Sequence, residues 1–169
     1  MAKVYWFTGL SGAGKTTLGR LWYEHLQAEN SFAVFLDGDV LRQVFGDDLG
    51  YSESDRRKSA MRNARLCEML VKQGADVICC TISMFDSVRE WNRENIPGYI
   101  EIYVRTSMET LKKRDQKGLY TSARNDVAGV NFNVEEPKNP DIILDNNGDI
   151  TPEEQIMLIA KKLNEKDDK

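Results

Sequence analysis

The chain has 169 residues, of which 41% are hydrophobic and 30% charged, and its formal net charge at pH 7 is −4. This size suits one domain with a hydrophobic core, and the acidic balance without any basic run argues against nucleic acid as a partner. No apolar run is long enough to cross a bilayer, and Cys67, Cys79 and Cys80 lack the spacing of a metal site, so we expect a cytoplasmic protein without membrane contact.

The first predicted elements are a short apolar strand over residues 4–7 and a helix with apolar residues at Leu18, Leu21, Trp22 and Leu26. The loop between them matches the phosphate-binding P-loop, G-x-x-x-x-G-K-[ST]. Backbone N–H groups of such a loop converge on phosphate oxygens, and the helix N-terminus adds partial positive charge. In this pattern Lys15 reaches the β- and γ-phosphates of ATP, and the Thr16 hydroxyl is a Mg²⁺ ligand. The candidate ATP-binding residues are therefore Gly9, Ser11, Gly12, Ala13, Gly14, Lys15, Thr16 and Thr17.

A second strand is predicted over residues 32–36, and we expect it to be buried beside the P-loop strand. It ends in Asp37-Gly38-Asp39. Two acids at this position are candidates for holding Mg²⁺ through water and for accepting a proton from an attacking hydroxyl. The alternative is a surface turn, in which aspartate is common for conformational reasons.

The remaining elements alternate between helix and strand. A short amphipathic piece with Val40, Leu41, Val44 and Phe45 comes first, and Ser52 then caps a helix that runs to about Gln73. Further strands are predicted over residues 77–82, 98–104 and 141–144, before a final helix that begins at Thr151-Pro152. The alternation predicts an α/β fold of the P-loop nucleoside-kinase type, a three-layer sandwich around a mainly parallel five-stranded sheet.

Residues 115–139 carry charges and glycines but few apolar positions, which predicts a long mobile loop. Arg114, Lys117 and Arg124 give this segment basic groups that could close over a triphosphate, so we interpret it as a lid. We expect a single kinase domain over residues 1–164 and a frayed tail over 165–169.

Ligands of parallel α/β sheets gather at the carboxyl ends of the strands, so the P-loop, Asp37-Gly38-Asp39 and Ser83 should share one cleft. Arg42 and Arg56 could clamp a phosphate group of a second substrate, and Ser59 shares a helix face with Arg56. For Arg57 and Arg65 we favour a solvated helix face.

Several stretches together resemble the adenylylsulfate (APS) kinase family over about residues 3–160. They are the P-loop, Asp37-Gly38-Asp39 with Arg42, Asp48-Leu49-Gly50-Tyr51-Ser52 with Asp55-Arg56, Arg114-Asp115 with Lys117-Gly118-Leu119-Tyr120, and Glu136-Pro137-Lys138-Asn139-Pro140. The P-loop is shared by many kinases, whereas the combination is distinctive.

The resemblance implies transfer of the ATP γ-phosphoryl group to the 3′-hydroxyl of adenosine 5′-phosphosulfate. It implies that Asp39 is the base at the acceptor hydroxyl and that Asp37 is the acid on the magnesium side. Arg42 and Arg56 would hold the phosphate end of the acceptor, and Tyr51 would stack on its base. Ser83 matches a serine often described as a phosphoserine intermediate, although direct in-line transfer needs no enzyme nucleophile. Family members often form dimers, so a homodimer is one expected assembly.

The departures from the family pattern lie on the acceptor side. The family usually reads Ile-Ser-Pro-Tyr-Arg where this chain has Ile82-Ser83-Met84-Phe85-Asp86, so an arginine has become an acid. A helix asparagine corresponds to Ser59, and a lid phenylalanine expected on the other face of the base corresponds to Val127. Loss of one stacking face, worth about 1–3 kcal/mol by analogy with nucleic-acid stacking, favours a smaller base. Asp86 would suit a phosphoramidate, which has N–H donors, better than a sulfate.

Three functional hypotheses follow. The first is an APS kinase of sulfate assimilation. The second is a paralogous kinase that acts on another nucleotide, such as cytidine diphosphoramidate in bacterial capsule biosynthesis. The third is a module that binds ATP as a sensor or scaffold without phosphorylating anything, against which the retained Lys15, Asp37 and Asp39 argue.

Overall fold

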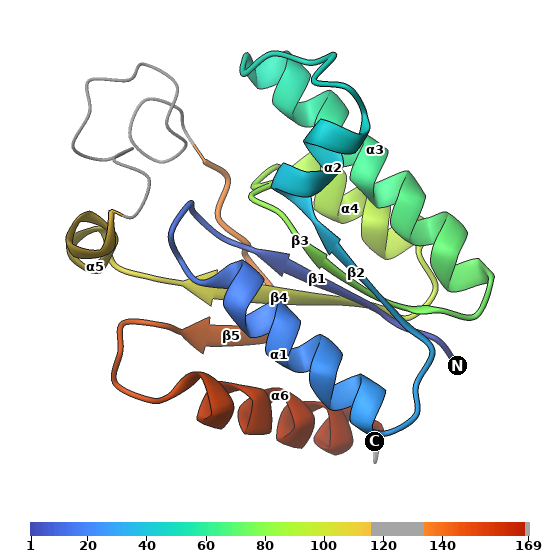
Figure 1. The fold of residues 1–169 in the computed structure, drawn as a ribbon, viewed down its shortest axis with the longest axis vertical. Helices are drawn as coiled ribbons and strands as arrows, with labels where there is room; N and C mark the ends of the chain where they lie inside the picture. The colour runs from blue at the N-terminus through green and yellow to red at the C-terminus, as the bar shows by residue number, and fades with distance from the viewer. Residues whose placement is uncertain (116–133, 168–169) are drawn as a thin grey trace.

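The computed structural model describes residues 1–115 and 134–167, and its centre is a single parallel sheet (Figure 1). The strands lie in the order β2-β3-β1-β4-β5, and every neighbouring pair is parallel. They are β1 (Val4–Thr8), β2 (Ala33–Asp37), β3 (Asp76–Cys80), β4 (Tyr99–Arg105) and β5 (Ile142–Asp145). The helices are α1 (Lys15–Ala28), α2 (Gly38–Val44), α3 (Glu53–Lys72), α4 (Asp86–Asn95), α5 (Met108–Arg114) and α6 (Pro152–Asp167).

Helices cover both faces of the sheet, which confirms the predicted three-layer α/β sandwich. On one face Leu18 of α1 and Ile159 of α6 share a core with Phe7, and on the other Ala64 of α3 and Val88 of α4 share a core with Trp6. Successive strand residues point to opposite faces, so β1, which is buried along its whole length, supplies both cores.

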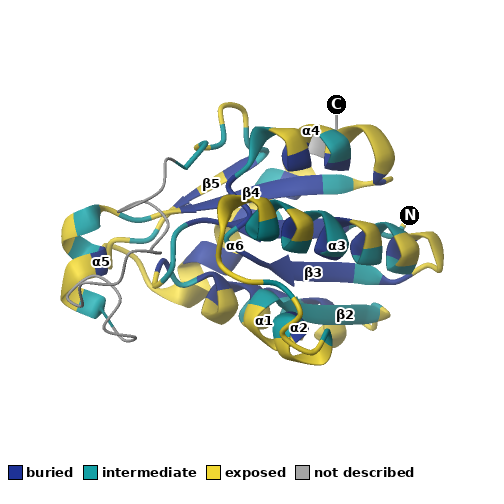
Figure 2. Ribbon diagram, turned by 90° about the horizontal axis from the view of Figure 1, so that it is seen from above, coloured by how far each residue is buried: buried dark blue, intermediate teal, exposed yellow. Residues whose placement is uncertain are grey.

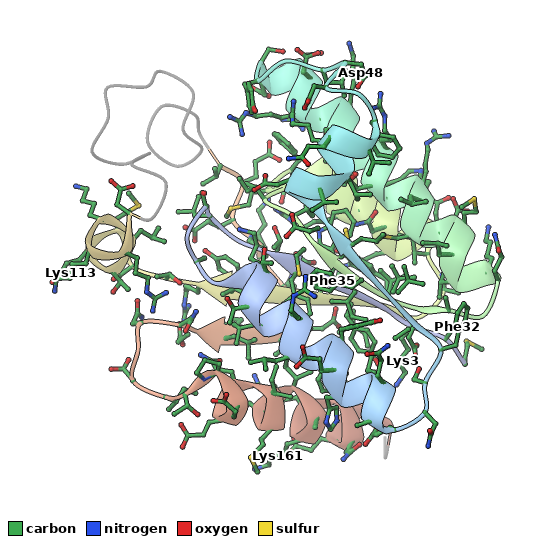
Figure 3. All side chains as sticks on the ribbon, in the orientation of Figure 1. Lys3, Phe32, Phe35, Asp48, Lys113 and Lys161 are labelled. Carbon is green, nitrogen blue, oxygen red and sulfur yellow. The ribbon has the colours of Figure 1, made fainter. Side chains whose placement is uncertain are left out.

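β2 is an edge strand, which corrects two predictions. It does not lie beside the P-loop strand, because β3 lies between β2 and β1. Nor is it buried, since all its residues have intermediate exposure, whereas β1 and β3 are mostly buried (Figure 2). Phe35 still packs against Tyr23 and Arg20 of α1, while Phe32 just before the strand is 68% exposed (Figure 3).

Most helix ends agree with the sequence pattern. The Ser52 hydroxyl accepts a hydrogen bond from the Asp55 N–H at the start of α3, and Gly74 follows the helix with a φ of +91°. The short piece after β2 is helical, but Val40 and Val44 are exposed and only Leu41 is buried. α6 continues to Asp167, into the tail that we expected to fray from residue 165.

The predicted lid, residues 115–139, lies largely outside the described residues, and so do Lys117, Arg124 and Val127 within it. Its described end, residues 134–139, has no regular secondary structure and leads into β5. Among the residues described, no helix combines the length and apolar character that crossing a membrane requires.

Candidate active site

A cavity of about 480 Å³ opens at the carboxyl ends of β1, β2 and β3. Its walls come from the P-loop, the start of α2, the first half of α3 and the residues that follow β3. The predicted site residues that line it are Ser11, Gly12, Gly14, Lys15, Thr16, Thr17, Asp37, Asp39, Arg42, Tyr51, Arg56, Ser59, Ser83 and Arg114. The fold therefore brings together groups that lie more than a hundred residues apart in the chain.

Lys15 is the first residue of α1, and its side chain turns back over the P-loop. Its Nζ donates a hydrogen bond to the Leu10 carbonyl at 2.7 Å, and the residue is only 9% exposed. The loop turns at Gly14, whose φ of +99° favours glycine; an added Cβ there would lie 2.4 Å from Nδ2 of Asn146. Nδ2 of Asn146 donates to the Ala13 carbonyl at 2.7 Å, so the residue that follows β5 supports the loop.

The two groups predicted to hold magnesium meet directly. Oγ1 of Thr16 donates a hydrogen bond to Oδ2 of Asp37 at 2.7 Å, across 21 positions of sequence. A hydroxyl and a carboxylate oxygen are hard ligands of the kind that Mg²⁺ takes together with phosphate oxygens and water. Among the described residues no cluster of three or more His, Cys, Asp or Glu forms a complete metal cage. The donor set therefore fits a magnesium ion that is shared with a nucleotide.

Asp37 also positions the second acid. Its Oδ1 accepts hydrogen bonds from the N–H groups of Asp39 and Val40, at 2.9 and 3.3 Å, and so caps α2. The backbone at Gly38 lies close to β3. A Cβ added at this position would lie 3.2 Å from the Cys80 carbonyl oxygen. The Asp-Gly-Asp sequence therefore joins β2 to α2 with both acids at the cavity.

Ser83 lies in a strained, buried turn after β3. Its φ is +31°, a value that residues other than glycine rarely adopt, and its hydroxyl lies 2.7 Å from that of Thr81. Two contacts hold this turn, since Thr8 donates to the Ile82 carbonyl and the Glu135 N–H donates to the Met84 carbonyl.

Two arginines enclose the ring of Tyr51. The guanidinium carbon of Arg42 lies 4.5 Å from the ring centre, and that of Arg56 lies 5.5 Å away. Arg42 also donates to the carbonyls of Leu49 and Gly50, and Arg56 donates to the Tyr51 carbonyl at 2.9 Å. The loop before α3 thus orders both cations at the cavity wall, beside an aromatic ring that is 55% exposed.

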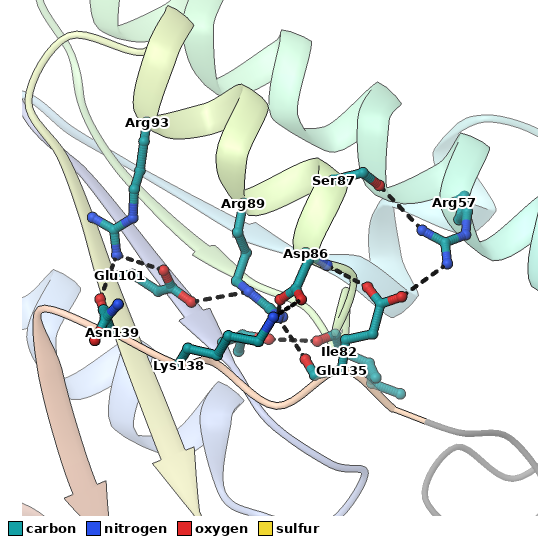
Figure 4. A network of polar contacts seen from close by, with 11 residues as sticks. Arg57, Ile82, Asp86, Ser87, Arg89, Arg93, Glu101, Glu135, Lys138 and Asn139 are labelled. Carbon is teal, nitrogen blue, oxygen red and sulfur yellow. Dashed lines mark hydrogen bonds and ion pairs between the residues drawn. The ribbon is translucent and has the colours of Figure 1, made fainter.

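Asp86 does not line the cavity, in contrast to its predicted place on the acceptor side. One carboxylate oxygen pairs with Arg89 and the other with Nζ of Lys138 at 2.9 Å (Figure 4). The hydrogen bond from Lys138 is the main cause of a lowered pKa for the Asp86 carboxyl, with Arg89 adding to it. The acid that replaces the family's arginine is thus paired within the protein and lies outside the cavity lining, and its role toward the acceptor stays a prediction.

Asp86 belongs to a wider ion-pair network that fixes residues 135–141 to α3, α4 and β4 (Figure 4). Buried Glu101 pairs with Arg89 at 3.3 Å and Arg93 at 2.6 Å, and burial raises its pKa although both arginines act to lower it. Arg89 also donates to the Glu135 carbonyl at 2.6 Å. Arg57, for which we favoured a solvated face, instead pairs with Glu135 at 3.2 Å.

Replacing Glu101 by glutamine should lower the free energy of unfolding by about 3 kcal/mol, since breaking a buried ion pair leaves uncompensated charge. Glu109→Gln is the matched control, because Glu109 forms an exposed pair with Lys113 at 2.7 Å. That variant should cost at most about 0.5 kcal/mol. Denaturant titration measures both changes, and equal small losses would contradict a structural role for the network.

Two further predicted residues do not line the cavity. Gly9 is a close-packing position, because an added Cβ would lie 2.4 Å from the Val104 carbonyl oxygen. Ala13 is fully buried, and its N–H donates to the Leu10 carbonyl at 3.2 Å. Neither residue lines the cavity, and their place among the ATP-binding residues stays a prediction. Lys117 and Val127 lie outside the described part of the chain.

Sequence reasoning missed Thr81, Asn63 and Asn146, all of which line the cavity. Thr81 and Asn146 directly follow β3 and β5, so the strand-end rule that selected Ser83 could have selected them. Asn63 lies seven residues after Arg56 and four after Ser59, so helical periodicity places it on the same face.

The fold and this cavity define a P-loop kinase. A family model described as adenylylsulphate kinase matches residues 1–145. The chain belongs to that family.

Individual relatives agree with this assignment. The chain is 40% identical over 164 residues to the cytidine diphosphoramidate kinase of Campylobacter jejuni, covering 95% of each chain. It is 37% identical over 165 residues to the adenylyl-sulfate kinase of Halothermothrix orenii, covering 95% of this chain and 89% of the relative. Among solved structures, the Mycobacterium tuberculosis APS kinase in complex with AMPPNP and APS superposes with a TM-score of 0.87 and 32% identity, over 96% of this chain and 98% of that one.

Proposed function

We propose that this kinase transfers the γ-phosphoryl group of ATP to the 3′-hydroxyl of a nucleotide acceptor. One observation carries the proposal: a single cavity is lined by the P-loop on one side and by Asp39, Arg42, Arg56 and Tyr51 on the other. A triphosphate and a second anionic nucleotide can therefore meet in it. Family membership supports the reaction class.

In the proposed reaction the acceptor's 3′-oxygen forms a bond to the γ-phosphorus, while the bond from that phosphorus to the β–γ bridging oxygen breaks. Asp39 accepts the hydroxyl proton, and the leaving electron pair stays on ADP. Lys15 and the P-loop N–H groups stabilise the negative charge of the transferred group, and Arg114 adds charge from the end of α5. We assign Ser83 no nucleophilic role, because the residue is only 6% exposed, its hydroxyl is paired with that of Thr81, and direct transfer needs no enzyme nucleophile.

Thr16 and Asp37 would hold Mg²⁺, which supplies charge neutralisation on the β- and γ-phosphates when it is bound. Asp37 keeps its place by capping α2, so the same carboxylate serves the metal site and the fold.

For the acceptor we propose cytidine diphosphoramidate. The relative of that name is 40% identical and is covered almost completely. Val127 at the position of a family phenylalanine also favours a smaller base. The second candidate is APS, which the relative from Halothermothrix orenii and the structural similarity to the mycobacterial enzyme favour. We do not base this choice on Asp86, since both of its oxygens pair within the protein.

Steady-state kinetics with ATP, Mg²⁺ and each acceptor test the proposal. We expect kcat/KM for cytidine diphosphoramidate to exceed that for APS at least about tenfold, which corresponds to 1.4 kcal/mol of transition-state binding. Phosphorus NMR of the product should place the new phosphate on the 3′-oxygen. APS turnover at about 10⁴ M⁻¹s⁻¹ or better, with no preference for the cytidine compound, would leave the APS kinase assignment standing.

The hypothesis of a sensor without transferase activity predicts the opposite result, namely ATP binding without acceptor-dependent consumption of ATP.

A homodimer and a cytoplasmic location belong to the same proposal. The location is supported by three free, buried cysteines that suit a reducing compartment. Sedimentation of the purified protein measures the assembly.

A further inference from the structure

A strained turn forms one wall of the cavity. Ile82, Ser83, Met84 and Phe85 all line the cavity, and Ser83 has a φ of +31°. A residue other than glycine keeps such a conformation only when its surroundings hold it there. The contacts that hold this turn therefore also fix part of the cavity wall.

Glu135 makes two of these contacts, one on each side of Phe85. Its N–H donates a hydrogen bond to the Met84 carbonyl at 3.1 Å, and its Oε2 accepts one from the Asp86 N–H (Figure 4). Asp86 is the first residue of α4, and Phe85 at the N-cap makes no side-chain capping hydrogen bond. A carboxylate from a distant segment thus satisfies one of the N–H groups that a helix leaves without an internal partner, and its charge suits a helix N-terminus.

The same carboxylate ties the turn to α3. Oε1 of Glu135 accepts a hydrogen bond from Arg57 at 3.2 Å, and the guanidinium carbon of Arg57 lies 4.4 Å from the centre of the Phe85 ring. Arg57 directly follows Arg56, which lines the side of the cavity that we propose for the acceptor. The P-loop, between β1 and α1, belongs to the other side. The turn is therefore held against the acceptor side.

We propose that Glu135 is a positioning residue, which holds the turn of residues 82–85 in the form that binds the acceptor nucleotide. Glu135 does not line the cavity, so it acts through the turn and not on the substrate. This inference rests on the proposed function and adds to it a residue that shapes the acceptor side. A residue that only capped α4 would change stability and leave acceptor binding as it is, so the two roles can be separated.

Two variants of Glu135 test the positioning role. Glu135→Ala loses both contacts of the carboxylate, whereas Glu135→Gln keeps a neutral oxygen that can still accept from the Asp86 N–H. With cytidine diphosphoramidate or APS, whichever the wild type uses better, KM for the acceptor should rise about tenfold in the alanine variant, the effect of one lost hydrogen bond to a charged group. The glutamine variant should restore part of this loss. KM for ATP should stay within about twofold and kcat within about threefold, since Lys15 and Asp39 keep their contacts.

Glu136→Ala is the matched control. Glu136 is the next residue, is exposed and does not line the cavity, and its side chain forms a hydrogen bond with Tyr103 of β4. The control variant therefore loses one contact of the same segment without loss of a contact to the turn. Its KM values for both substrates should stay within about twofold of wild type, with all assays run below the lowest melting temperature of the set.

Hydrogen exchange followed by mass spectrometry tests the turn itself and needs no turnover. A peptide that covers residues 81–88 should exchange about tenfold faster in Glu135→Ala than in the wild type, because the turn opens locally more often. A peptide that covers the P-loop should keep its wild-type rate. Glu136→Ala should leave both peptides unchanged.

An acceptor KM within twofold of wild type in both Glu135 variants would overturn the inference and leave Glu135 as a cap of α4 alone. An equal rise in the KM for ATP, or failure of both variants to fold, would also overturn it, because the effect would then not be confined to the turn. Absence of wild-type turnover with every acceptor would remove the proposed function. The exchange experiment would still decide whether Glu135 holds the turn.

Discussion

Replacing Lys15 by alanine should lower kcat/KM about 10²- to 10³-fold, the usual cost of one lost group that stabilises transition-state charge. Nζ of Lys15 lies within the turn of the P-loop, 2.7 Å from the Leu10 carbonyl oxygen. From this position we expect its positive charge to stay close to the phosphoryl group during transfer. Steady-state kinetics with the preferred acceptor measure the loss.

The side chain of Lys15 is buried, so an alanine variant also loses packing. Lys15→Met is therefore the matched variant, because methionine fills most of the space of the lysine stem and lacks only the charge. Both variants should lose activity, and Lys15→Met should keep the wild-type melting temperature within a few degrees. Turnover within tenfold of wild type in the methionine variant would contradict the proposal that the P-loop binds the transferred phosphate.

Asp39→Asn should lower kcat about 10²- to 10⁴-fold with little change in ATP affinity, since the variant cannot accept the proton of the acceptor hydroxyl. Asp37→Asn should instead shift the magnesium dependence to higher concentrations, because Asp37 contacts Thr16 at the proposed metal site. Asparagine caps helices as well as aspartate does, so α2 should stay folded in the Asp37 variant.

Magnesium titrations of both variants, with ATP affinity measured in parallel, distinguish the two roles. An equal shift of the magnesium dependence in both variants would show that the assignment of Asp37 to the metal and Asp39 to the proton is wrong.

The class of fold and the position of the P-loop between a strand and a helix could be predicted from the sequence, because these depend on local patterns. A strand, a glycine loop and a helix in direct succession define the P-loop, and capping residues such as Ser52 mark helix ends. The strand order depends on contacts between distant segments, so the insertion of β3 between β1 and β2 could not be deduced from hydrophobic runs.

The ion pairs near the proposed acceptor side could not be predicted from the sequence, because they join distant segments of the chain. Asp86 looked like a substrate ligand from its position in a motif, yet its partners include Lys138, which is 52 positions further along the chain. Arg57 looked like a solvated helix residue, yet it contacts Glu135 from that same distant segment. Periodicity alone would have placed Asn63 beside Ser59, but only the folded structure shows that its oxygen is buried and has no hydrogen-bond partner among the described residues.

The division of the cavity between two parts of the chain has a consequence for how such enzymes diversify. The donor side rests on β1 and α1, whereas Arg42, Tyr51, Arg56, Ser59 and Asn63 lie in one continuous segment from α2 into α3. Asp37 joins the two, with one oxygen toward Thr16 and the other toward the start of α2. Recombination between paralogous genes could therefore exchange most of the wall that we propose for the acceptor as one continuous segment, while the residues proposed to bind ATP are inherited unchanged.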